Sequence, residues 1–169
     1  MLREAADPLM SALGLRPKTG QAVLDQHQQV MRGPSELSPA FRELIAAFTS
    51  AINGCPLCRA AHTRVAELLG YPPATLDALL SGPDAAPLSE REMALFAYLE
   101  KTITAPAKLS ANDAERTFAA GWSELAVHDA LNVCCLFCSI NRFVLGHGIT
   151  AGPAAIEASA RKLARRGYG

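Results

Sequence analysis

Apolar residues recur along most of this chain at spacings of three and four positions, which place side chains on one face of an α-helix. The clearest stripe consists of Phe41, Leu44, Ile45, Phe48 and Ile52. The alternation that is typical of β-strands is missing, and Pro and Gly fall between the apolar segments. The pattern therefore predicts an all-α fold. The expected helices cover residues 3–13, 20–32, 39–53, 56–69, 73–81, 90–103, 111–120, 124–145 and 153–166.

Several of these helices have recognisable starts. Ser38 followed by Pro39 is typical of an N-cap and a first helical position. Ser89 and Glu92 have the spacing of a capping box, in which each side chain accepts a hydrogen bond from the other residue's backbone. These boundaries indicate separate helices joined by short connections.

The segment 124–145 is apolar on nearly every side, which is typical of a central or interface helix. A chain of 169 residues is long enough for one domain with a sizeable core. We therefore expect residues 1–169 to form a single multi-helix bundle. The apolar surface of this bundle exceeds what its own helices can cover, so we expect the protein to oligomerise through helices.

The charge pattern excludes some classes of partner. Sixteen basic and sixteen acidic residues balance, and no basic patch stands apart, so nucleic-acid binding is not expected. We expect no apolar run to reach the ~20 residues that cross a bilayer. The N-terminus lacks a signal-peptide pattern, and five cysteines is an odd count that favours a reducing compartment. A cytoplasmic protein without membrane partners is the resulting prediction.

Candidate chemistry is concentrated at Cys55, Cys58 and His62. Helix positions three and four apart are neighbours, so Cys58 is expected to contact both Cys55 and His62. The imidazole can then activate one sulfur, and the other sulfur can capture the oxidised product as a disulfide. Glu43, one helix upstream, could orient His62 if it were brought alongside. The spacing therefore favours a thiol enzyme that cycles between dithiol and disulfide.

The residues alone leave the division of roles open. Sharing a face with His62 favours Cys58 as the attacking thiol. The helix start favours Cys55, which we also expect to be the more exposed of the two. Glu43 lies on a stripe of small residues, where the pattern alone favours a solvated carboxylate. His62 could also be a packed histidine, or could bind a metal ion together with Cys58 and Glu43.

A second CxxC occurs at Cys135 and Cys138, next to Cys134. It lies too far downstream of the first pair to match the usual spacing of a four-cysteine zinc site. Since these three cysteines are embedded in an apolar segment, we expect them to be small core residues. Within the same segment, Arg142 is expected to neutralise a buried carboxylate or to pair across a subunit interface.

The order Glu43, Cys55-x-x-Cys58-x-x-x-His62 resembles the core motif of alkylhydroperoxidase D-like proteins, in the carboxymuconolactone decarboxylase superfamily. The likeness is strongest to the subgroup called peroxidase-related enzymes. A second block of similarity comprises residues 97–106, 121–122 and 137–149. The resemblance covers about residues 35–150 of the chain.

The resemblance implies an all-α fold whose subunits assemble into trimers or hexamers. It also implies reduction of hydroperoxides without a bound cofactor or metal, with a dithiol or thioredoxin-like protein as the reductant. The resemblance further implies that Cys58 attacks the peroxide, that Cys55 resolves the product, and that His62 and Glu43 form a proton relay.

One position departs from the family. The classical members have a histidine directly before the second motif cysteine, where this chain has Leu57. The preferred peroxide and the reductant therefore stay open. Two other functions remain as alternatives: a non-catalytic redox-sensing or binding oligomer, and a decarboxylase-like enzyme acting on a small acid.

Overall fold

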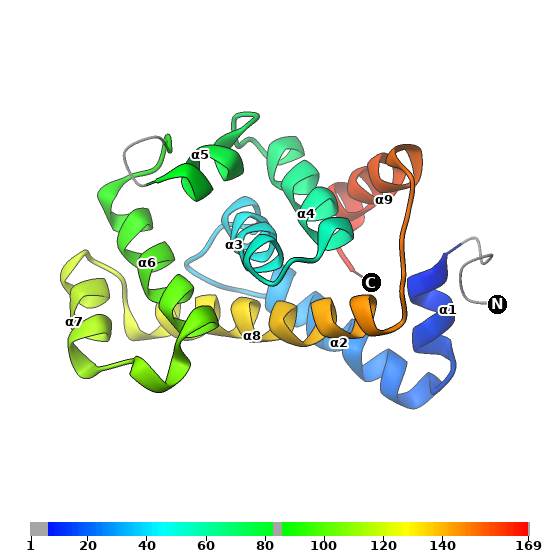
Figure 1. The fold of residues 1–169 in the computed structure, drawn as a ribbon, viewed down its shortest axis with the longest axis horizontal. Coiled ribbons are helices and arrows are strands. Elements are labelled where there is room, and N and C mark those ends of the chain that lie inside the picture. Colours follow the sequence, from blue (N-terminus) through cyan, green and yellow to red (C-terminus); the bar gives the residue numbers. More distant parts are fainter. Residues whose placement is uncertain (1–6, 83–85, 169) are drawn as a thin grey trace.

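The computed structural model describes residues 7–82 and 86–168, and these form α-helices and one short 3₁₀ helix with no β-strand among them (Figure 1). The all-α prediction is confirmed. The helices are α1 (Pro8–Gly14), α2 (Pro17–Arg32), α3 (Pro39–Ile52), α4 (Pro56–Leu68), α5 (Thr75–Ser81), α6 (Glu90–Thr104), η3 (Pro106–Lys108), α7 (Ala111–Ala119), α8 (Glu124–Gly146) and α9 (Pro153–Arg166).

The predicted boundaries differ from the observed ones by three residues or fewer wherever the structure describes them. The predicted start of the first helix, residues 3–6, lies outside the described residues. Helix α2 begins earlier than predicted because Pro17 occupies its first turn, where a missing backbone N–H costs nothing. The caps at Ser38 and Ser89 are both present, the latter as a complete capping box with Glu92.

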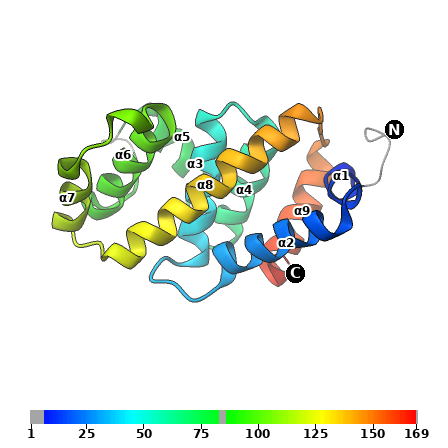
Figure 2. The same cartoon turned by 90° about the horizontal axis from the view of Figure 1, so that it is seen from below.

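Helix α3 is the most enclosed element of the structure: every residue from Phe41 to Ser50 is buried. It packs against α2, α4, α5, α6 and α8. Figure 1 shows α3 and α4 in the middle, α6 and α7 on one side, and α1, α2 and α9 on the other. In Figure 2, α8 crosses in front of α3 and α4 along most of the molecule.

Helix α8 was expected to be a central or interface helix, and it lies at the periphery with one face against α2, α3 and α6. Leu125 and Leu145, near its two ends, are exposed. The helix has the length and composition of a membrane span, with a mean hydropathy of 1.3 over 18 residues, of which 44% are buried. The expectation that no segment reaches this length was therefore wrong, although core helices share these properties.

A three-residue turn between α3 and α4 positions the motif. Gly54 adopts a left-handed conformation with φ +66°, which glycine tolerates without a steric penalty. The N–H of Cys55 donates to the carbonyl of Ser50 at 2.9 Å and that of Gly54 to Ala51 at 3.1 Å. This is a Schellman arrangement, which closes α3 and folds α4 back along it. The turn thereby brings residues of the two helices that are far apart in sequence into contact.

Candidate active site

Glu43 and His62 form a buried pair between α3 and α4. His62 Nδ1 donates to Glu43 Oε2 at 2.7 Å, and Glu43 is 0% exposed. The solvated position favoured by the residue pattern is therefore wrong for Glu43, because α4 covers the small-residue face of α3. A carboxylate partner assigns the ring proton to Nδ1 and leaves Nε2 as the free nitrogen of His62.

Two further residues hold the same carboxylate. Glu43 Oε1 accepts hydrogen bonds from Arg32 Nη2 at 2.6 Å and from the Tyr168 hydroxyl at 2.9 Å. Burial alone would raise the pKa of Glu43, but the hydrogen bond from His62 and the charges of His62 and Arg32 hold it below the ordinary value. Glu43 is therefore an anion with a donor on each oxygen.

Sequence reasoning missed Arg32 and Tyr168. Tyr168 follows α9 and lies 125 positions from Glu43, so no spacing rule connects them. Arg142 was expected to neutralise a buried carboxylate or to pair across a subunit interface. It is exposed and donates to the carbonyl of Cys138 in its own helix, while Glu43 pairs with Arg32. In the sequence, Arg32 is only a basic residue at the end of a predicted helix. Basic residues at that position are commonly explained by their interaction with the helix dipole.

The motif thiols lie at the start of α4. Cys55 is the N-cap residue, with an extended backbone conformation, and Cys58 lies in the first turn. Cys55 is 1% exposed and Cys58 is 7% exposed, so the expectation that Cys55 is the more accessible thiol was wrong. The Schellman turn folds the Cys55 side chain inward, beneath the loop.

The two motif thiols differ in acidity. A hydrogen bond from Cys58 lowers the pKa of Cys55 to about 6, and the same interaction together with burial raises the pKa of Cys58. Cys55 therefore loses its proton more readily than Cys58 does.

A buried amide network lies beside the thiols. The Asn141 side chain from α8 interacts with both Cys55 and Cys58. Asn141 Nδ2 donates to Ser50 Oγ at 3.0 Å, and Asn141 Oδ1 accepts from Asn53 Nδ2 at 3.0 Å. Two hydrogen bonds thus fix the Asn141 side chain beside the thiols.

His62 makes no direct hydrogen bond to either motif thiol. Its ring packs edge-on against Phe137, with centroids 4.5 Å apart, on the side of α4 that faces α8. Proton transfer between His62 and the sulfurs therefore needs a bridging water or the substrate itself. Leu57, at the position of the missing family histidine, packs against the hydrophobic core.

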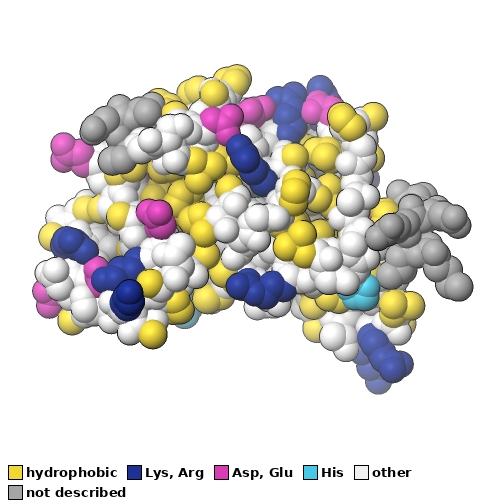
Figure 3. Space-filling view, in the orientation of Figure 1, with side chains coloured by type: hydrophobic (Ala, Val, Ile, Leu, Met, Phe, Trp, Pro, Cys, Tyr) yellow, Lys and Arg dark blue, Asp and Glu magenta, His cyan; other side chains and the backbone are white. Residues whose placement is uncertain are grey.

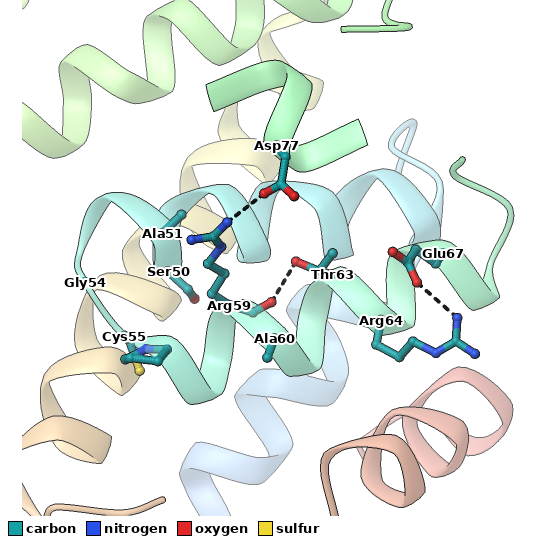
Figure 4. A pocket seen from close by; sticks show the side chains of 11 residues that line it. Ser50, Ala51, Gly54, Cys55, Arg59, Ala60, Thr63, Arg64, Glu67 and Asp77 are labelled. Atoms are coloured by element: carbon teal, nitrogen blue, oxygen red, sulfur yellow. Dashed lines mark hydrogen bonds and ion pairs between the residues drawn. The ribbon is translucent and has the colours of Figure 1, made fainter. Parts of the chain in front are cut away.

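A cavity of about 540 Å³ runs along the opposite side of α4, as seen in Figure 4. Cys55 borders it at one end, and Arg64 with Glu67 lies at the other (Figure 4). Between them Arg59 forms an ion pair with Asp77 at 2.6 Å. The cavity thus reaches the turn that carries Cys55, while Cys58 and His62 face the bundle interior.

The other cysteines lie on α8. Cys134 is buried, Cys138 is half-buried and Cys135 is exposed, so the expectation of core residues holds for Cys134 and is wrong for Cys135. Cys138 Sγ accepts a hydrogen bond from Asn53 Nδ2 at 3.6 Å. Hydrogen bonds from Cys134 and Asn53 lower the pKa of Cys138 to about 6.

The metal-site interpretations gain no geometric support. Within residues 7–82 and 86–168, no three His, Cys, Asp or Glu side chains are grouped so that they could hold one ion. The two CxxC sequences do not converge on a common point.

The fold and the paired thiols define an all-helical bundle of the alkylhydroperoxidase D-like kind. The family model described as "Carboxymuconolactone decarboxylase family" matches residues 17–101, so the chain belongs to this family. The predicted family relationship is confirmed. No curated protein matches the sequence.

Several solved structures are similar, among them two peroxidase-related proteins. An uncharacterized peroxidase-related protein from Silicibacter sp. TM1040 has 25% identity and a TM-score of 0.81, covering 88% of this chain and 78% of its own. A protein described as an alkylhydroperoxidase AhpD core, also uncharacterized and peroxidase-related, comes from Ralstonia eutropha JMP134. It has 23% identity and a TM-score of 0.78, covering 85% of this chain and 76% of its own. The second likeness concerns the fold alone.

Proposed function

We propose that this protein is a thiol-dependent peroxidase that reduces hydroperoxides through a Cys55–Cys58 dithiol/disulfide cycle. One observation carries the proposal: the two motif thiols lie at the start of α4, one turn from a buried pair in which His62 Nδ1 donates to Glu43 Oε2 at 2.7 Å. Membership in a family with peroxidase-related relatives supports it.

The first step is loss of one thiol proton. The N-terminal end of α4 and the hydrogen bond between the sulfurs stabilise the resulting charge. His62, held through Nδ1 by Glu43, accepts this proton at Nε2 through a bridging water. The lowered pKa of Cys55 places this charge first on Cys55, and transfer of the Cys58 proton to the Cys55 sulfur then forms the attacking Cys58 thiolate.

Peroxide cleavage follows. The Cys58 thiolate attacks the terminal peroxide oxygen, the O–O bond breaks, and the products are a Cys58 sulfenic acid and an alkoxide. The His62 imidazolium returns its proton to the alkoxide and gives the alcohol. The sulfur of Cys58 is oxidised by two electrons, and the peroxide is reduced by the same two.

Resolution uses the neighbouring thiol. Cys55 attacks the sulfenic sulfur of Cys58, a disulfide forms, and water leaves. An external dithiol or thioredoxin-like protein then restores both thiols by exchange and is itself oxidised to a disulfide. Cys55 borders the cavity along α4, so we propose that exchange begins at its sulfur. The cycle requires no bound cofactor. It does require a reducing compartment, such as the cytoplasm.

We also propose a homo-oligomer, a trimer or hexamer, as the family resemblance implies. Hydrophobic side chains reach the surface over the middle of the face drawn in Figure 3. Leu125 and Leu145 on α8 and Phe118 on α7 are exposed as well. Sedimentation at micromolar concentration tests this, and a stable monomer would contradict it.

Peroxide consumption with excess dithiol tests the proposed reaction. The wild-type protein is expected to turn over many equivalents of an alkyl hydroperoxide, and Cys58→Ser to turn over none. Cys135→Ser, which alters an exposed thiol on α8, is the matched control and is expected to keep full activity. Turnover that survives in Cys58→Ser would overturn the proposal.

The same assay separates the alternatives. A redox sensor would consume one equivalent of peroxide and stop, even with reductant present. An enzyme of another class, such as a decarboxylase acting on a small acid, would keep its activity without either motif cysteine. Trapping sulfenic acid in Cys55→Ser identifies the attacking thiol, since the proposal expects the adduct on Cys58.

A further inference from the structure

Tyr168 is held beside the Glu43–His62 pair by contacts with α2. Gly167 turns the chain after α9 with φ +72°, and the Tyr168 N–H donates to Gln28 Oε1 at 2.7 Å. The Arg32 guanidinium lies over its ring, 5.2 Å from the centroid. The ring also packs against His27, with centroids 5.6 Å apart. Backbone and ring are therefore both fixed, which places the hydroxyl at a defined point.

That hydroxyl contacts both members of the pair. It lies 2.9 Å from Glu43 Oε1 and 3.3 Å from His62 Nδ1. His62 Nδ1 already donates its proton to the carboxylate, so the Tyr168 proton goes to Glu43. Burial and the negative charge of Glu43 raise the pKa of Tyr168 well above its ordinary value. Tyr168 therefore keeps its proton and serves as a hydrogen-bond donor.

The two donors on Glu43 Oε1 have different consequences. Arg32 supplies the compensating charge for a carboxylate that is 0% exposed. Tyr168 adds a neutral donor on the same oxygen, which blocks rotation of the carboxyl group. A fixed carboxylate holds the His62 proton on Nδ1.

We propose that Tyr168 is a positioning residue that keeps His62 in the Nδ1–H form, so that Nε2 stays available as the proton acceptor. The proposal rests on the proposed function, because it assigns His62 the role of base. It deepens that function by adding a residue that follows the last helix to the relay.

The test variant is Tyr168→Phe, which removes only the hydroxyl and leaves the packed ring. Tyr71→Phe is the matched control, since the Tyr71 hydroxyl donates to Glu92 Oε1 at 3.1 Å, away from the thiols. In Tyr168→Phe the carboxyl group loses a contact that fixes it, so fewer molecules present a free His62 Nε2. The kcat for peroxide is therefore expected to fall about 2- to 10-fold.

A second readout does not depend on turnover. Nitrogen-15 NMR of the histidine rings, with His62→Gln used for assignment, reports which nitrogen of His62 carries the proton. We expect the Nδ1–H form in the wild type and in Tyr71→Phe, and a larger Nε2–H fraction in Tyr168→Phe. A wild type that consumes no peroxide would refute the proposed function, and this NMR comparison would still test Tyr168.

Two results would overturn the inference about Tyr168. One is a kcat and a tautomer fraction in Tyr168→Phe that match the wild type. The other is an equal change in both tyrosine variants, which would indicate a general loss of packing. Thermal melts of the two variants, compared with the wild type, establish that folded protein is measured in each case.

Discussion

Two groups of cysteines in this molecule look alike in sequence and differ in structure. The first, Cys55 and Cys58, lies at the start of α4 beside His62. The second lies within α8, where Cys138 has Cys134 one turn before it. Hydrogen bonds lower the pKa of one thiol in each group, Cys55 and Cys138, to about 6. Acidity alone therefore does not distinguish them.

The difference lies in what surrounds each acidic thiol. Cys55 is an N-cap residue with φ −100° and ψ 95°, just outside the regular helix that holds Cys58. Cys134 and Cys138 are both inside a regular helix, where positions four apart have Cβ atoms ~5–6 Å from each other. A disulfide needs about 3.5–4.5 Å. The comparison teaches that a redox pair needs a partner outside the regular helix and a proton acceptor as well as a thiolate.

Removing the charge of Glu43 is expected to have the largest effect, because it breaks the feature that only the first group has. Glu43→Gln leaves Arg32 largely buried without its counter-ion, which is expected to cost about 3 kcal/mol of unfolding free energy. Denaturant unfolding followed by the fluorescence of the buried Trp122 measures this.

The control for that variant is Glu67→Gln. Glu67 pairs with Arg64 at 3.0 Å on a more exposed part of α4, so its loss is expected to cost about 1 kcal/mol or less. Equal losses in the two variants would show that Glu43 contributes no more than a surface ion pair.

Replacing His62 makes the first group resemble the second. His62→Gln removes the proton acceptor while keeping a polar side chain, and kcat for peroxide is expected to fall about 10²-fold. The exposed His128 on α8 provides the control, since His128→Gln is expected to leave kcat unchanged. A His62→Gln variant with wild-type kcat would remove the imidazole from the mechanism.

The pH dependence of thiol reactivity sharpens the comparison. Since only the thiolate reacts, alkylation of Cys55 and of Cys138 is expected to be fast at pH 7 and to decline as pH falls through about 6. Site-resolved mass spectrometry measures both rates in one sample. Cys134→Ala removes the main donor to Cys138, so the Cys138 midpoint alone is expected to move to higher pH.

The smallest expected effect comes from Asn53, which contacts Cys138 of the second group and reaches the first group only through Asn141. Asn53→Ala removes donors to Cys138 Sγ and Asn141 Oδ1, and we expect a loss of about 1 kcal/mol in stability. Alkylation of Cys138 at pH 7 is expected to slow by severalfold, with that of Cys55 changed less. The reverse order would place Asn53 in the first group.

The helices could be predicted from the sequence because local rules govern them. Apolar spacing and the caps at Ser38 and Ser89 are short-range signals, and the structure reproduces them. The burial of Glu43 could not be predicted from its own helix, because it depends on how the Gly54 turn folds α4 onto α3. The family motif supplied that pairing where periodicity alone favoured the opposite.

The contacts of Arg32 and Tyr168 lie beyond any local rule. Each joins α3 to a segment that the sequence pattern treats independently, and only the assembled bundle brings them together. The exposure of Cys135 has a similar origin. An apolar segment predicts a buried helix, yet only one face of α8 is covered by its neighbours within the described residues.

The most direct test of the redox pair is a single addition of hydroperoxide to the reduced wild-type protein, followed by denaturation, alkylation and peptide mass spectrometry. The account predicts that Cys55 and Cys58 lose two hydrogen atoms and resist alkylation as an intramolecular disulfide, while Cys134, Cys135 and Cys138 are alkylated. Free alkylated thiols at Cys55 and Cys58, with the oxidation found on α8, would contradict it.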